Sequence, residues 1–201
     1  MADASIPILS FTNIRAFEAY MSAQPAQSKG LWLKLSKMGA PAATISKEEA
    51  VEAALCCGWI DGQLGKFDEH YYLVRMTPRR LGSRWSAKNR DTADRLAREG
   101  RLTPAGLLQV DQAKRDGRWA AAYQSQGKAE PPSDLMLALG KNAKAARFFE
   151  TLDRANRYAI IYRVNDAKRA DTRTKRIADF VQMLARGETL HPPKDGGKKA
   201  R

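Results

Sequence analysis

The sequence contains very few residues of the kinds that bind metals or form cross-links. Among its 201 residues there are two cysteines, Cys56 and Cys57, and two histidines, His70 and His191. Two adjacent cysteines cannot cross-link distant parts of a fold by a disulfide bond. A structural zinc site needs four ligands, which are usually supplied as spaced pairs. We therefore predict no metal and no cofactor, and we expect both cysteines to be small core residues.

The sequence also lacks any long apolar run. No stretch approaches the roughly 20 apolar residues that a membrane-spanning helix needs. Residues 1–7 include neither a basic segment nor an apolar one. We therefore expect no membrane span and no secretion, and the low cysteine content favours a reducing cytoplasm.

Motifs of the common enzyme classes are missing as well. The glycines of residues 58–65 lack the G-K-[ST] ending of a P-loop and the spacing of a dinucleotide fingerprint. No G-x-S-x-G elbow occurs. We therefore assign no catalytic residues and favour a non-enzymatic protein over an enzyme.

What the chain has in excess is positive charge. The formal net charge is +13, yet residues 1–70 carry six basic and eight acidic side chains, so the whole surplus lies after His70. Such asymmetry favours an anionic partner, with nucleic acid as the first candidate. A solvated, arginine-rich helix surface would have the same composition, and that interpretation stays open.

Periodicity and capping residues divide the chain into elements. Apolar spacing and capping residues predict helices, and alternation predicts strands at 31–35, 59–63 and 71–76. The helices are expected at 13–23, 46–57, 86–99, 103–117, 133–139, 142–152, 153–167 and 171–186. The pattern predicts an α+β fold, in which a small antiparallel sheet packs with helices and a C-terminal helical bundle follows.

Polar and Pro/Gly-rich stretches predict the domain boundaries. We expect an N-terminal tail at 1–10, an α+β domain at 11–123, a linker at 124–132, a helical domain at 133–190 and a disordered basic tail at 191–201.

The first candidate site is a basic, aromatic segment before a predicted helix. Arginine forks, hydroxyl groups and a helix N-terminus together form an anion receptor, and an exposed tryptophan could stack on a base. Alternatively, Trp85 packs in the core while the arginines pair with acidic residues 61, 68 and 69. The candidate residues are Arg75, Arg79, Arg80, Arg84, Trp85 and Lys88.

A second basic set spans the junction of the last two predicted helices. Its members could follow a phosphate backbone, or they could form the solvated flank of a bundle helix. They are Lys168, Arg169, Arg173, Lys175 and Arg176.

A third candidate is a small-ligand pocket around Asp61, which lies between a large apolar residue and a glycine. Together with Trp59, Ser86 and Asn89 it could line a site for a carboxylate or phosphate ligand. A structural role, in which Asp61 pairs with a neighbouring group, is the interpretation that we favour.

Several separated motifs also occur in an order that resembles one bacterial family. They are LWL at 31–33, residues 48–62, 72–89, 100–106 and 116–123, then NRY at 156–158, AK at 167–168, TR at 172–173, RI at 176–177 and residues 184–187. From about residue 10 to 192 the chain resembles the YdeI/OmpD-associated, or bacteriocin-protection, family. It departs from the usual pattern at residues 64–65 and 81–82, in predicted loops. The resemblance brings no catalytic residues.

Resemblance and charge together lead to one functional hypothesis. We expect a non-enzymatic, cytoplasmic stress or bacteriocin-protection protein that binds a polyanion, DNA first. An enzyme or small-anion binder is the alternative, and a protein partner docking on the C-terminal bundle is a third.

Overall fold

The computed structural model describes residues 6–25 and 27–192 of the chain. They form two compact units, one ending at Tyr123 and one beginning at Gln124.

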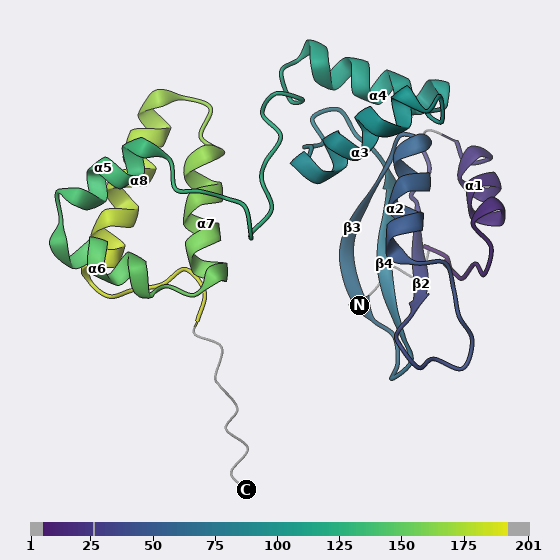
Figure 1. Cartoon of the computed structure of the whole chain (residues 1–201), viewed down its shortest axis with the longest axis horizontal. Helices are drawn as coiled ribbons and strands as arrows, with labels where there is room; N and C mark the ends of the chain where they lie inside the picture. Colours follow the sequence, from purple (N-terminus) through teal and green to yellow (C-terminus); the bar gives the residue numbers. More distant parts are fainter. Residues whose placement is uncertain (1–5, 26, 193–201) are drawn as a thin grey trace, which may run out of the picture. The chain divides into compact units, whose positions relative to one another are not determined.

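The first unit contains a four-stranded sheet of order β1-β2-β4-β3 (Figure 1). Strands β2 (Leu31–Ser36), β3 (Trp59–Lys66) and β4 (Tyr71–Pro78) pair antiparallel, as predicted. Strand β1 (Ile8–Leu9) pairs parallel to β2, so the sheet is mixed. This strand lies within the expected N-terminal tail, and the sequence did not predict it because two residues are too few for alternation to be recognised. Residues 1–5 of that tail lie outside the described part.

Four helices accompany the sheet: α1 (Ile14–Ser22), α2 (Lys47–Cys56), α3 (Ala87–Arg98) and α4 (Pro104–Arg115). Each begins where a capping side chain accepts a backbone N–H. Ser46 and Glu49 form the predicted capping box, with Ser46 Oγ accepting from Glu49 N at 3.1 Å. The local signals in the sequence are thus the contacts that start the helices.

Two hydrophobic clusters hold this unit together. In the first, alternate residues of β2 (Leu31, Leu33 and Leu35) point inward beside Phe17 and Met21. In the second, α3 and α4 pack at the C-terminal end of α2. Both cysteines are buried, as predicted, and burial raises the pKa of Cys56 to about 11. A thiol with such a pKa is inert at neutral pH.

The second unit is a helical bundle of α5 (Ser133–Gly140), α6 (Ala143–Thr151), α7 (Arg154–Asn165) and α8 (Ala170–Ala185). Phe149, Ile160 and Leu184 lie at its centre. The α+β class and the helical bundle are confirmed. Among the described residues, no helix is long and apolar enough to cross a membrane.

One residue of the expected linker and one of the expected tail form hydrogen bonds with this unit. His191 was predicted to begin the tail, but its N–H donates to Asn156 Oδ1 at 2.8 Å, and its carbonyl accepts from Asn156 Nδ2 at 3.2 Å. Gln124 was predicted to begin the linker, and its carbonyl accepts from the Tyr158 hydroxyl at 3.0 Å. Neither contact is predictable locally, because each joins residues more than thirty positions apart. Residues 193–201 of the expected tail lie outside the described part.

Candidate anion-binding site

In the segment after β4, serine hydroxyl groups accept hydrogen bonds from nearby backbone N–H groups. Ser83 Oγ accepts the N–H of Arg80 at 2.9 Å, and Ser86 Oγ accepts the N–H of Asn89 at 3.1 Å, which caps α3. Ser86 and Asn89 are both partly buried. The structure therefore places these two predicted pocket residues at the cap of α3.

Arg79 and Trp85 are both buried, with 6% and 2% of their surfaces exposed. The guanidinium carbon of Arg79 lies 3.6 Å from the centroid of the Trp85 ring, and its Nη1 donates to the carbonyl of Arg84 at 3.1 Å. Trp85 also meets Trp119 edge-on, with centroids 4.8 Å apart. A ring enclosed in this way cannot stack on a nucleic-acid base, so we remove Trp85 from the nucleic-acid contacts.

A second arginine that our sequence analysis missed lies near Arg79. Arg118 donates from Nη1 to the carbonyl of Ser83 at 2.8 Å and pairs with Asp116, with Nη2 and Oδ2 2.7 Å apart. Its side chain is 14% exposed. The signal in the sequence was its place directly before Trp119, which repeats the Arg84-Trp85 pair.

The pKa of Arg79 shows the electrostatic cost of this arrangement. Burial and, to a smaller extent, the positive charge of Arg118 lower this pKa to about 10, although Asp61 and Tyr123 oppose both effects. At neutral pH the guanidinium is still charged. Arg79 is thus a buried cation with a second cation in electrostatic range.

Asp61 and Trp59 occupy β3 beneath this segment. Trp59 is 4% exposed and belongs to the first core cluster. Asp61 forms a long ion pair with Lys47, at 3.7 Å, and its side chain is 24% exposed. The structure brings Asp61 within electrostatic range of Arg79, whereas the Trp59 side chain packs in the core.

The remaining basic residues of the first candidate site divide into two groups. Arg80, Arg84 and Lys88 are exposed around the start of α3, and we call them the α3 basic surface. Arg75 lies apart from them on the sheet, where its guanidinium donates to the backbone carbonyls of Lys29 and Leu31.

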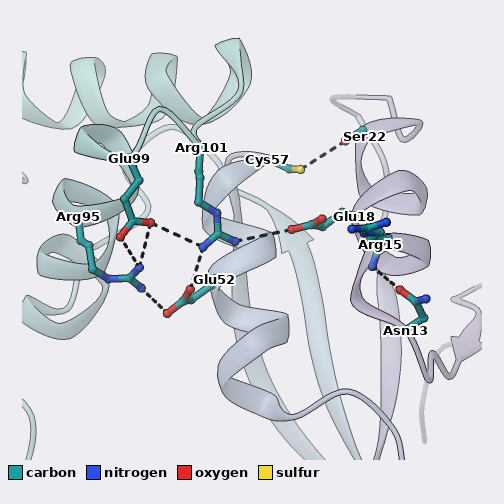
Figure 2. A network of polar contacts seen from close by, with 9 residues as sticks. All are labelled: Asn13, Arg15, Glu18, Ser22, Glu52, Cys57, Arg95, Glu99 and Arg101. Atoms are coloured by element: carbon teal, nitrogen blue, oxygen red, sulfur yellow. Dashed lines mark hydrogen bonds and ion pairs between the residues drawn. The ribbon is translucent and has the colours of Figure 1, made fainter.

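Arg95, near the end of α3, and Arg101, which follows this helix, form ion pairs with carboxylates. Figure 2 shows Arg95 and Arg101 sharing Glu52 and Glu99, while Arg101 also faces Glu18 at 3.8 Å. These contacts join α1, α2 and α3 at the surface.

The second basic set is divided in a similar way. Arg173 grips Asp134 of α5, with Nε–Oδ2 and Nη2–Oδ1 distances of 2.5 and 2.9 Å. Arg176 donates to the carbonyl of Arg163 and lies 3.7 Å from Asp166. Arg169 pairs with Asp171 at 3.6 Å. Lys168 and Lys175 are exposed and form no ion pair with another described residue.

A cavity of about 340 Å³, which our sequence analysis did not predict, lies between α6 and the C-terminal end of α8. Its lining residues are Lys144, Arg147, Phe148, Thr151, Leu184, Ala185 and Gly187. In the described part of the chain, no group of three His, Cys, Asp or Glu side chains is placed to hold a metal ion.

The architecture defines an α+β unit followed by a helical bundle, with arginines at the candidate site. Residues 9–109, about half of the chain, match a family model described as a domain of unknown function, DUF8412. Residues 128–187 match the model described as "Bacteriocin-protection, YdeI or OmpD-Associated". The chain therefore belongs to the DUF8412 family and carries a YdeI/OmpD-associated domain in its second unit.

These matches confirm the predicted resemblance over the second unit and restrict its extent. The YdeI/OmpD-associated model covers 128–187, whereas the predicted similarity began near residue 10. The motifs at 31–33, 48–62, 72–89 and 100–106 fall within the other family model, and the motif at 116–123 lies outside both matches. No curated protein and no solved structure matches the chain significantly.

Proposed function

We propose that this chain is a non-enzymatic, bacteriocin-protection-type protein of the bacterial cytoplasm that binds a polyanion, with nucleic acid as the first candidate. The match of residues 128–187 supports the bacteriocin-protection part. The polyanion part rests on one observation: the exposed side chains of Arg80 and Lys88 form no ion pair with a carboxylate of the described residues.

The α3 basic surface has the composition that phosphate binding requires. Arg80 and Lys88 are exposed, and neither side chain forms an ion pair with another described residue. They flank the N-terminus of α3, whose helix dipole adds further positive potential. Such residues contact the phosphates of a nucleic acid whatever its base sequence, and the resulting affinity falls steeply as the salt concentration rises.

The test is the binding of labelled duplex and single-stranded DNA, followed by fluorescence anisotropy across a salt titration. We expect binding at low salt to the wild-type protein. The double variant Arg80→Glu/Lys88→Glu should bind about tenfold more weakly and with a shallower salt slope, because two phosphate contacts are lost.

A charge-matched control separates this surface from net charge. Arg15 and Lys66 are also exposed and form no ion pair with another described residue, and they lie on α1 and at the far end of β3. Arg15→Glu/Lys66→Glu should therefore leave affinity much closer to wild type. Absence of binding at low salt would remove the polyanion proposal, and equal losses in both double variants would remove the α3 basic surface as the binding site. Lys168→Glu/Lys175→Glu tests the second basic set in the same assay.

A further inference from the structure

One whole edge of the buried Arg79 guanidinium lacks an acceptor. Its Nη1 donates to the carbonyl of Arg84, but Nε and Nη2 are fully buried and have no hydrogen-bond partner among the described residues. The indole Nε1 of Trp85, on which Arg79 stacks, is buried without a partner as well. Buried donors of this kind are rare, and a buried charge without an acceptor is costly.

The unpartnered edge of Arg79 is the one that grips carboxylates elsewhere in this chain. In Arg173, Nε and Nη2 donate to the two oxygens of Asp134, and in Arg186 the same two nitrogens donate to Glu188. This parallel fork matches the spacing of two oxygens in a carboxylate or phosphate group. Arg79 therefore presents a complete oxyanion fork to which no described carboxylate is bound.

The nearest acidic groups do not fill this role. Asp61 pairs with Lys47, and Asp116 pairs with Arg118. No described carboxylate lies within ion-pair distance of the Arg79 guanidinium, although Arg118 adds a second positive charge to its surroundings. The buried Arg79 thus lies in a positively charged part of the first unit.

We infer that the Arg79 fork, with Arg118 and Trp85 beside it, is a binding site for a small oxyanion, namely a phosphate or a carboxylate group. A polymer backbone cannot follow a side chain that is 6% exposed, so the ligand is a small molecule or a terminal group. The partly exposed side chains of Asp61, Arg118 and Tyr123 surround Arg79 and must rearrange to admit it. The site is distinct from the α3 basic surface and does not depend on nucleic-acid binding.

The test is calorimetric titration of the full-length protein with inorganic phosphate and, separately, with acetate. Chloride holds the ionic strength constant. We expect saturable binding of at least one of the two oxyanions, together with a rise in Tm. The two titrations distinguish a phosphate site from a carboxylate site. A change in the near-ultraviolet circular dichroism should accompany binding, because Trp85 lies against the fork.

Arg79→Lys keeps the positive charge but removes the fork, so binding should weaken about tenfold, as expected when a charge-assisted hydrogen bond is lost. Arg15→Lys, the same change at an exposed arginine of α1, should bind like the wild type. If Arg79→Lys does not fold, Arg118→Lys replaces it and should also weaken binding. The site would be overturned if the wild type bound neither anion saturably. It would also be overturned if folded Arg79→Lys, or Arg118→Lys in its place, bound as tightly as the wild type.

Discussion

At the scale of single residues, the close approach of α4 to the end of α2 depends on Gly106. Thr103, which caps α4, donates its N–H and its hydroxyl to the carbonyl of Cys56, at 3.0 and 2.8 Å. These bonds draw the first turn of α4 onto the end of α2. A Cβ added at Gly106 would lie 2.3 Å from the Cys56 oxygen. No shift of a flexible side chain can relieve that overlap, because the atom belongs to the backbone.

We expect Gly106→Ala to destabilise the first unit by about 2 kcal/mol or more, the usual range for overpacking. Helix propensity alone would predict a gain of about 1 kcal/mol at this helical position. Urea unfolding, followed by circular dichroism, measures the difference. Gly140→Ala is the control, because a Cβ at this last residue of α5 meets nothing within 4 Å. A Gly106→Ala protein as stable as wild type would contradict the close approach.

At the scale of elements, Arg173 connects three helices of the second unit. It extends from α8, grips Asp134 at the start of α5, and donates from Nη1 to the carbonyl of Val164 near the end of α7 at 2.9 Å. The hydrogen bond from Arg173 lowers the pKa of Asp134 below its usual value. Our sequence analysis placed this arginine among the phosphate contacts, whereas the structure shows a contact between helices.

Replacing Arg173 by alanine should therefore lower the free energy of unfolding of the second unit by about 1–2 kcal/mol, since the pair is only partly buried. Lys175→Ala, two residues farther along α8, is the matched control, because Lys175 is exposed and forms no ion pair with another described residue. Chemical unfolding measures the free energy of unfolding of both variants. A larger loss in Arg173→Ala than in Lys175→Ala would show that Arg173 connects the helices. Equal stability of the two variants would refute the connecting role.

The same pair predicts a pH dependence. A carboxyl whose folded-state pKa is lowered stabilises the fold above its unfolded pKa of about 4, and this contribution disappears as the pH falls through the folded value. The difference in stability between wild type and Asp134→Asn should therefore be present at pH 7 and shrink below pH 4. Unfolding curves at several pH values test this, and a difference that does not change with pH would contradict it.

At the scale of the whole molecule, the chain contains separate hydrophobic cores. Two clusters belong to the first unit and one, centred on Phe149 and Ile160, belongs to the second. No cluster of the described residues includes members of both units. The first family match ends at residue 109, before the division between Tyr123 and Gln124, and the second begins at residue 128, after it. Each unit therefore has the apolar contacts that cooperative folding requires.

We expect fragments 1–123 and 124–201 to fold independently when expressed separately. Each should unfold cooperatively with urea, and the sum of their circular dichroism spectra should match that of the full chain. A second fragment without a cooperative transition would show that its bundle depends on the first unit.

The elements of the fold were largely predictable, whereas the candidate site was not. Caps such as Ser46 and Thr103 and the alternation of β2 are local signals, so they predicted most boundaries within a few residues. Strand β1 was missed because two residues carry no periodicity. At the site, the sequence identified Arg79 and Trp85 but not their burial, and it did not single out Arg118.

The sequence by itself determined the α+β class, the order of the helices and strands, the uneven charge and the resemblance of the C-terminal part to its family. These properties depend on neighbouring residues or on composition. Only the tertiary structure decided which cations face solvent, because their partners are distant in sequence: Arg173 meets Asp134 across 39 positions, and Arg118 meets Ser83 across 35. Burial and pairing are decided by such long-range contacts, and they separate the exposed Arg80 from the enclosed fork of Arg79 beside it.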